Sequence, residues 1–320
     1  MNRATAVSAF LFVFSLAGTP SVASENYPTR PIRLVVPAPP GSGTDAAARI
    51  LAQPMQAELG GSIVIENRPG AAGQVGSAAV ARSAPDGYTL LLTSNTSHSA
   101  APFLYKQVAY DPVKDFTAIG RISFYLFALL VPAGNPAQSP SELAAYAKKK
   151  GAVSYSFGNS TAQVAGAVFV KSAGIDATPV AYKGTPPALA DVAGGVVDFM
   201  FADWAAAQPF VSSGRLRAIG TLSSTPSNLI GDVTPMAGDS TLYSFSSWAG
   251  IAGPAGMDKA IVSRLNKALN VALNDKEVQQ KLGALGMVVA PDSSENFDAF
   301  VSDQVQAWGD KITSLGISVD

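Results

Sequence analysis

The 320-residue chain has no cysteine and a single histidine, His98. Without cysteine it can form no disulfide, and it offers no thiol nucleophile and no lipoprotein cleavage site. One histidine cannot build the histidine cluster of a zinc site. Charged residues make up only 14% of the chain, and the formal net charge is −1. No basic surface for nucleic acid is therefore expected, and we predict no metal, no cofactor and no nucleic-acid partner.

Long apolar runs are also scarce, and the one at the N-terminus is short. Arg3 precedes "AVSAFLFVFSLAG", and the small residues "SVA" follow at positions 21–23. The run is shorter than the roughly 18 apolar residues that a membrane span needs. A basic residue, a short apolar run and small residues in this order predict a signal peptide over residues 1–23, cleaved after Ala23. An exported chain without disulfides fits the bacterial periplasm.

Strand and helix patterns alternate along the rest of the chain. They predict a strand "IRLVV", a helix over 44–59, a strand "SIVIEN", a helix within "GQVGSAAVARSA" and a strand "YTLLLT". This order is typical of an α/β fold with parallel strands and right-handed crossovers. The middle of the chain also alternates strand and helix patterns, and "YLFALLVP" is predicted to be one strand. Helices are expected at 258–274, 276–285 and 294–315, and the length allows two lobes.

Small polar residues gather where three predicted strands end. The segments are "PAPPGSGTD", "TSNTSHS" and "GNSTAQ", and no cluster of lysine or arginine lies nearby. Ligands of open α/β sheets bind at the carboxyl ends of strands, where helix N-termini present unpaired N–H groups and partial positive charge. The segments therefore predict a small anion held by amides and hydroxyls. Two structural readings stay open: Ser160 with Gln163 as a capping box, and Thr44 as an ordinary N-cap.

Two other function classes fit the sequence poorly. Residues 158–162 resemble a nucleophile elbow, but Ala162 stands at the last glycine and His98 precedes the candidate serine, against the usual order. We therefore expect no enzyme, and we expect His98 to be a hydrogen-bonding loop residue. Gly70, Gly73 and Gly76 do not have the spacing of a dinucleotide fingerprint.

Several stretches resemble one family closely. "YPTRPIRLVVPAPPGSGTDAAAR", "IVIENRPGAAGQVGSAAVARSAPDGYTLLL", "VAYKGTPPALADVAGGVVDFMFAD" and "SSWAGIAGPAG" are similar to the periplasmic receptors of tripartite tricarboxylate transporters, the Bug or TctC family. The resemblance covers residues 27–320. It implies a type II periplasmic binding protein fold, with two α/β lobes joined by crossover strands. It also implies a receptor that closes over a small aliphatic or aromatic carboxylate and delivers it to membrane permease subunits. A sensor that presents the ligand to a signalling partner is the alternative, and a hydrolase is a weaker one.

The order of the motifs predicts where the lobes lie, and the resemblance implies where the site lies. Lobe 1 is expected to combine residues 27–123 and 243–320, lobe 2 to span 124–242, and the receptor to be a monomer. The expected ligand-binding residues are Gly41, Ser42, Gly43, Thr44, Asp45, Ser94, Asn95, Thr96, Ser97, Gly158, Asn159, Ser160, Thr161, Tyr182, Lys183, Gly184 and Asp203.

The chain departs from the family pattern at two positions. Ala38 stands where many members carry Phe or Tyr, and Gln163 lies near a position where many members carry histidine. These differences leave the ligand's identity open. Three further roles stay open. Asp203 is either a ligand contact or a solvated loop residue, and Trp204 and Trp248 either line the cleft or pack within a lobe.

Overall fold

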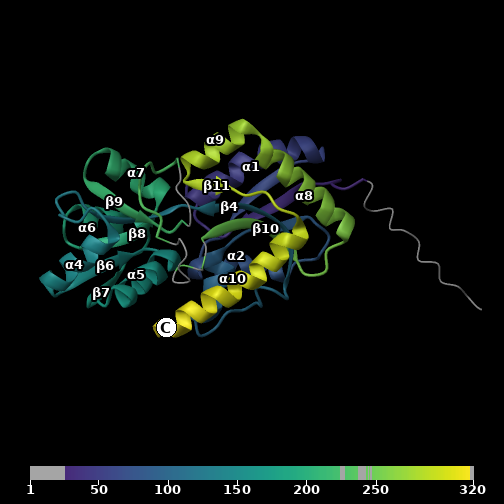
Figure 1. The fold of residues 1–320 in the computed structure, drawn as a ribbon. Coiled ribbons are helices and arrows are strands. Elements are labelled where there is room, and N and C mark those ends of the chain that lie inside the picture. Colours follow the sequence, from purple (N-terminus) through teal and green to yellow (C-terminus); the bar gives the residue numbers. More distant parts are fainter. Residues whose placement is uncertain (1–25, 224–227, 237–242, 244, 246, 318–320) are drawn as a thin grey trace, which may run out of the picture.

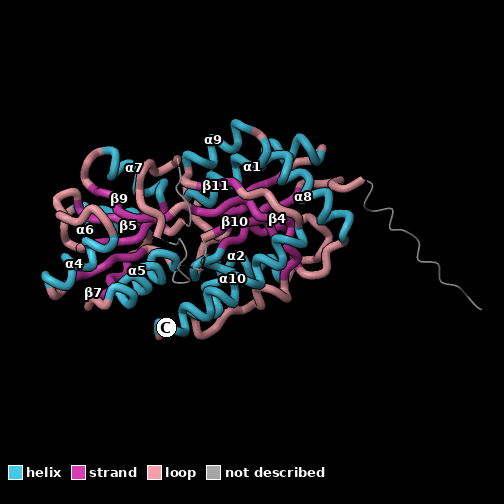
Figure 2. The backbone as a smooth tube through the Cα atoms, viewed as in Figure 1, coloured by secondary structure: helices cyan, strands magenta, loops and turns pink. Residues whose placement is uncertain are grey.

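The computed structural model describes residues 26–223, 228–236, 243, 245 and 247–317. Within them the chain forms one six-stranded and one five-stranded sheet. Helices cover both faces of each sheet (Figures 1 and 2). We call the part built on the six-stranded sheet lobe 1 and the part built on the five-stranded sheet lobe 2. The two-lobed α/β architecture expected from the sequence is therefore present.

The sheet of lobe 1 has the strand order β11-β4-β10-β3-β1-β2. Strands β2, β1 and β3 are parallel to one another, whereas β10 runs antiparallel to β3 and β4, and β11 antiparallel to β4. The sheet is therefore mixed, because the chain re-enters it at β10 after building lobe 2. Its strands are β1 (Ile32–Val36), β2 (Ile63–Asn67), β3 (Thr89–Ser94), β4 (Phe116–Tyr125), β10 (Trp248–Pro254) and β11 (Met287–Val289).

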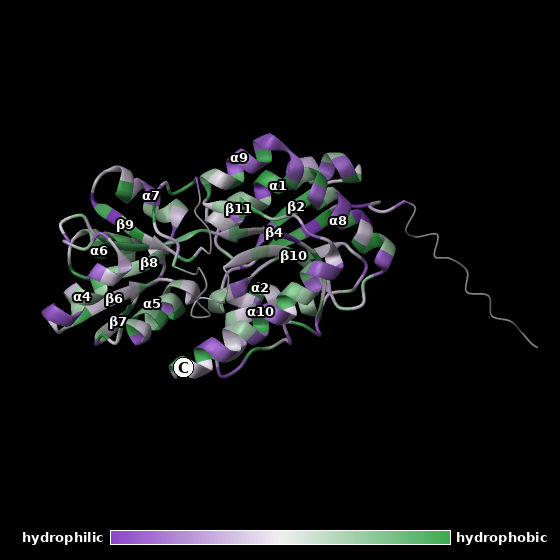
Figure 3. Cartoon of the chain, in the orientation of Figure 1, coloured by the Kyte–Doolittle hydropathy of each residue, from purple (hydrophilic) through white to green (hydrophobic). Residues whose placement is uncertain are grey.

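The alternation of side chains along β1 divides the core of lobe 1 between two faces. Leu34 and Val36 pack with α1 (Gly43–Leu59), α8 (Lys259–Asn274) and α9 (Lys276–Ala284), whereas Val35 packs with α2 (Gln74–Ala81). The second face also holds α10 (Ser294–Leu315), which packs on β4 and β10 through Phe297 and Trp248. Figure 3 shows hydrophilic residues along α8 and α9 and apolar residues along the strands.

Lobe 2 repeats the layered arrangement with the strand order β7-β6-β8-β5-β9. Its strands are β5 (Phe127–Pro132), β6 (Val153–Phe157), β7 (Ala177–Ala181), β8 (Phe199–Asp203) and β9 (Leu216–Thr221). Strands β7, β6 and β8 are parallel, and β5 is antiparallel to β8 and β9. One face carries α4 (Pro140–Lys150) and α5 (Ser160–Ala173), and the other carries α6 (Thr185–Ala193) and α7 (Trp204–Ser212).

One residue separates the last strand of lobe 1 from the first strand of lobe 2. Strand β4 ends at Tyr125 and β5 begins at Phe127. Between them, Leu126 donates its N–H to the carbonyl of Gly286 at 2.9 Å and accepts from the N–H of Trp204 at 2.8 Å. The prediction of a single strand "YLFALLVP" was therefore wrong, because Tyr125 belongs to a strand of the other sheet.

Most predicted elements are confirmed to within a few residues. The sequence analysis missed β4 and β11 of lobe 1 and α7 of lobe 2. The predicted signal peptide over residues 1–23 lies outside the described residues. In the part of the chain that the structure describes, no helix combines the length and the apolarity needed to cross a membrane.

Candidate ligand-binding site

A cavity of about 240 Å³ lies between the lobes, which we call the inner cavity. The first residues of α1 and α5 and the residue before α7 line it, so three helix N-termini converge there. No lysine or arginine lines it among the described residues. Its lining residues are Gly43, Thr44, Ser94, Asn95, Thr96, Tyr125, Phe127, Asn159, Thr161, Asp203, Ala205, Ser247 and Leu285.

Asp45 holds the loop before α1 in place. Its carboxylate accepts hydrogen bonds from Gly41 N at 2.9 Å, Arg49 Nε at 3.0 Å and Asn67 Nδ2 at 3.0 Å. The hydrogen bond from Arg49 and those from Gly41 and Asn67 lower the pKa of Asp45 to about 2, although burial opposes the shift. Asp45 is thus satisfied inside the loop, and it does not line either cavity between the lobes.

Two backbone donors at the start of α1 remain for a ligand. Ser42 is the N-cap and accepts from Asp45 N at 3.2 Å, so the reading of Thr44 as N-cap was wrong. Among the described residues, no acceptor pairs with the N–H groups of Gly43 and Thr44. A β-carbon added at Gly43 would meet no atom within 4 Å. These two amides therefore border open space at a helix end that favours negative charge.

Asn95 joins the lobes beside the inner cavity. Its Nδ2 donates to Thr161 Oγ1 at 3.0 Å, and its Oδ1 accepts from Ser247 Oγ and Trp248 N, both at 3.2 Å. Asn95 and Thr161 are both buried. Asn95 thus connects the end of β3 to the first turn of α5 and to the start of β10.

The start of α5 differs from the expected capping box. Asn159 is the N-cap and its side chain accepts from Ala162 N at 2.9 Å. Ser160 instead donates its hydroxyl to Thr96 Oγ1 of lobe 1 at 3.2 Å. The capping-box reading of Ser160 with Gln163 was therefore wrong, because the helix begins one residue after its cap at Asn159.

Asp203 brings an acidic side chain to the lining of the inner cavity. It ends β8 and caps α7 by accepting from Ala206 N at 3.0 Å. Burial raises the pKa of Asp203, and the Ala206 N–H opposes this shift. Burial also raises the pKa of the neighbouring Tyr125 to about 12. Thr44 opposes this shift, and the nearby Asp203 adds to it. The Asp203 carboxyl is therefore half-buried and helix-bonded, which differs from a solvated loop residue.

A second cavity of about 510 Å³, the outer cavity, adjoins the inner one and shares Thr96 and Asn159 with it. Its walls are largely aromatic and apolar, and Gly158 and Ser160 lie in them. Its lining residues are Ala72, Thr96, Leu104, Tyr105, Phe157, Gly158, Asn159, Ser160, Gln163, Ala181 and Tyr182.

The structure brings most, but not all, of the predicted site residues to these cavities. Of the predicted set, six line neither cavity: Gly41, Ser42, Asp45, Ser97, Lys183 and Gly184. Gly184 lies behind the wall of the outer cavity, against Gly158. A β-carbon at Gly158 would overlap the backbone of Gly184 and Thr185. The sequence analysis missed Tyr125, Phe127, Ala205, Ser247 and Leu285.

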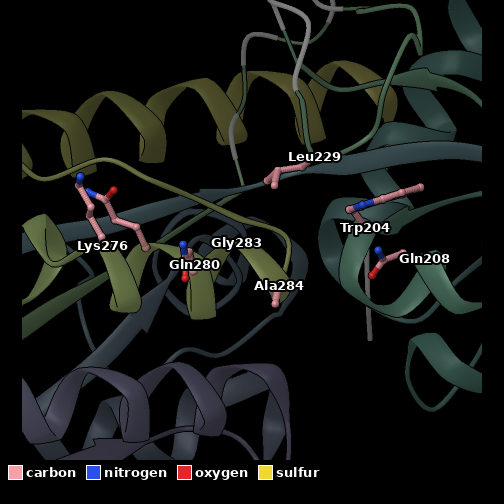
Figure 4. A pocket seen from close by; sticks show the side chains of 8 residues that line it. Trp204, Gln208, Leu229, Lys276, Gln280, Gly283 and Ala284 are labelled. Carbon is pink, nitrogen blue, oxygen red and sulfur yellow. The ribbon is translucent and has the colours of Figure 1, made fainter.

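A third groove lies between α7 and α9 (Figure 4). It has a volume of about 600 Å³, and none of the predicted site residues lines it. In Figure 4, Trp204 and Gln208 of α7 lie across from Gln280 and Ala284 of α9. Trp204 therefore lines this groove, whereas Trp248 is fully buried and donates its indole N–H to Ser99 at 3.3 Å.

His98 is buried within lobe 1. Its Nδ1 lies 2.7 Å from Thr93 Oγ1, and burial lowers its pKa to about 3. It lines neither the inner nor the outer cavity. Across the described ranges, no group of His, Cys, Asp and Glu side chains could hold a metal ion. His98 is thus hydrogen-bonded, as expected, but it lies in a π-helical turn (Thr96–Ala100) and not in a loop.

Comparisons with known proteins agree with this geometry. Residues 47–317 match the tripartite tricarboxylate transporter family receptor, TctC. Protein BugT of Bordetella pertussis is 32% identical over 99% of this chain and 98% of its own length. The structure of the periplasmic binding protein BugD has a TM-score of 0.78 at 31% identity, covering 92% of this chain and all of that one.

Two further relatives have structures with bound carboxylates. MatC of Rhodopseudomonas palustris with malate has a TM-score of 0.77 at 29% identity, over 89% of this chain and 100% of that chain. Rpa4515 of R. palustris with adipate has a TM-score of 0.80 at 27% identity, over 91% of this chain and 98% of that chain. Members of this family are binding proteins and not enzymes. The chain belongs to the TctC family of periplasmic solute receptors of tripartite tricarboxylate transporters.

Proposed function

We propose that this receptor captures a small carboxylate between its lobes and delivers it, as a monomer, to the membrane permease of a tripartite tricarboxylate-type transporter. The observation that carries the proposal is the pair of N–H groups of Gly43 and Thr44, which border the inner cavity and have no acceptor among the described residues. The malate and adipate of two relatives support the same ligand class.

A carboxylate suits the inner cavity better than a phosphate or a cation does. The donors there are amides and hydroxyls, and no basic side chain lines the cavity among the described residues. The three helix N-termini favour negative charge, whereas a phosphate would bring two charges to one position without gaining an ion pair there. A cation would meet a single carboxyl group among the described lining residues, that of Asp203, which already accepts a hydrogen bond from Ala206 N.

We propose the same lobes as the sequence suggested, and as ligand contacts the eleven predicted residues that line the two cavities. They are Gly43, Thr44, Ser94, Asn95, Thr96, Gly158, Asn159, Ser160, Thr161, Tyr182 and Asp203. Lobe 1 combines residues 27–123 and 243–320, and lobe 2 spans 124–242. The end of β4 at Tyr125 and the pairing of β10 with β3 and β4 support these boundaries to within a few residues.

Calorimetric titration with malate, adipate and their diamides tests the proposal. The acids should bind, and replacing both carboxylates by amides should weaken binding more than tenfold, about 1.4 kcal/mol. Gly43→Val should weaken binding of the acids as well, because its side chain enters the open space beside the amides. Gly134→Val is the matched control, since Gly134 is exposed and equally unobstructed but lies in the turn after β5.

Two results would overturn the proposal. One is equal affinity for acid and amide. The other is normal binding by Gly43→Val, which would leave the loop as a helix cap alone. Delivery to a permease is tested separately by ligand uptake into membrane vesicles that hold the permease, with and without added receptor. Uptake that does not depend on the receptor would contradict a transport role.

A further inference from the structure

The inner and outer cavities adjoin each other at the junction of the lobes. Thr96 and Asn159 line both of them. The inner cavity, at about 240 Å³, is below the range of about 300–1,000 Å³ that is usual for small-molecule pockets. The outer cavity adds about 510 Å³. A ligand anchored beside Gly43 therefore has room to extend past Thr96.

The two cavities differ in chemistry. The inner cavity combines hydroxyls, amides and the Asp203 carboxyl with the apolar Phe127, Ala205 and Leu285. Leu104, Tyr105, Phe157 and Tyr182 give the outer cavity a more apolar and aromatic wall. No charged side chain lines the outer cavity among the described residues. The hydroxyl of Tyr182 is already bonded to Asp191 at 2.5 Å, which leaves its ring for the wall.

Most polar side chains of the outer cavity come from the start of α5, and Thr96 of lobe 1 adds one more. Ser160 bonds Thr96 across the cleft at 3.2 Å. The side-chain amide of Gln163, one turn further along α5, is half-buried and has no partner among the described residues. An apolar body with at most one distal polar atom would match this lining, because a second charged group would lose its hydration without gaining a partner.

We propose, building on the carboxylate-receptor function above, that the physiological ligand is an elongated carboxylate. Its carboxylate binds at the start of α1, and its alkyl or aryl body occupies the outer cavity against Tyr105, Phe157 and Tyr182. The inner cavity selects the charged end, and the outer cavity selects the length and apolarity of the rest. Binding therefore discriminates a phenylalkanoate from the short acid that shares its carboxylate.

Paired titrations with propionate and 3-phenylpropionate test the proposal. The wild-type receptor should bind 3-phenylpropionate at least tenfold more tightly than propionate. Gln163→Trp, which fills the outer cavity from α5, should abolish this ratio. Phe157→Ala, which removes one aromatic wall, should reduce it. Ser172→Trp adds the same ring to an exposed position of α5 and should leave the ratio as in the wild type.

The outcomes separate this inference from the proposed function. Equal affinity for the two acids in the wild type, or an unchanged ratio in both Gln163→Trp and Phe157→Ala, would overturn the elongated ligand while leaving a carboxylate receptor. Failure of both acids and of adipate to bind would overturn the proposed function as well. Unfolding midpoints of each variant identify any that do not fold, and the remaining cavity variant then decides.

Discussion

The side-chain amide of Asn95, at the end of β3, donates a hydrogen bond to Thr161 Oγ1, in the first turn of α5, at 3.0 Å. This contact crosses from lobe 1 to lobe 2, and both side chains are buried. The other end of the Asn95 amide is held by Ser247 and Trp248. The lobes therefore meet through a polar contact whose members also line the inner cavity.

Thr161→Val should lower the stability of the ligand-free receptor. The change keeps the shape of the side chain but leaves the buried Nδ2 of Asn95 without its acceptor, which costs about 1–3 kcal/mol. Thr161→Ser retains the hydroxyl and should lose less. Urea unfolding measures both variants, and equal stabilities of Thr161→Val and the wild type would show that the interlobe contact contributes nothing.

Gly158→Ala should be strongly destabilising. A β-carbon there would overlap the backbone of Gly184 and Thr185, and backbone atoms cannot move aside as a side chain can. Overpacking of this kind costs typically about 1–3 kcal/mol. Gly134→Ala, where an added β-carbon meets nothing within 4 Å, is the control. A normal unfolding midpoint for Gly158→Ala would mean that the loops before α5 and α6 separate freely.

Asp45→Asn should lose stability in a pH-dependent way. The folded pKa of Asp45, about 2, lies below the ordinary value, so its charge stabilises the fold above about pH 4 and stops doing so as the pH falls toward 2. The melting temperatures of wild type and variant should therefore differ at pH 7 and converge toward pH 2. Glu277→Gln, which breaks an exposed pair with Lys281, should show almost no difference at any pH. A constant gap between wild type and Asp45→Asn would contradict the ionic role.

Asp203→Asn should bind a simple carboxylate more tightly at pH 7. Asparagine caps a helix as well as aspartate does, so α7 keeps its cap while the like charge beside the ligand disappears. Because burial raises the pKa of Asp203, the wild type should gain affinity relative to the variant as the pH falls. Titration of propionate against both proteins measures the effect. Weaker binding by the variant would indicate that Asp203 accepts a hydrogen bond from the ligand.

The sequence predicted the elements of this fold better than their pairing. Side-chain periodicity and helix-end signals located α1, α8 and α10, because those signals are local. β4 was missed at Phe116–Tyr125 because its residues alternate less clearly and its last one, Tyr125, runs directly into the apolar β5. Only the assembled sheets show that adjacent residues of one apolar run belong to different lobes.

The sequence predicted those residues of the candidate site that lie at strand ends and helix starts. Gly43, Thr44, Asn95 and Asn159 are such positions, and all four line the inner cavity. Ser247 and Leu285 carry no such signal, since long-range packing alone brings them there. Asp45 shows the converse: a carboxylate inside a binding motif was expected at the ligand, but it holds Gly41, because the loop's own donors lie closer to it.

The chain passes between the lobes at Leu126 and returns before Trp248, and Tyr125 N donates to Ser247 O at 2.9 Å where these passages meet. The two passages are bonded to each other and form one strip, and the C-terminal half of α10 forms a second link because Trp308 and Ile312 pack with the core of lobe 2. These links restrict the relative motion of the lobes, so we expect the opening angle to be the one large coordinate of the receptor. Each ligand then sets its own closing angle according to how far it fills the cleft, which X-ray scattering with short and long acids would register as different radii of gyration. A permease that docks on both lobes could read that angle without touching the ligand.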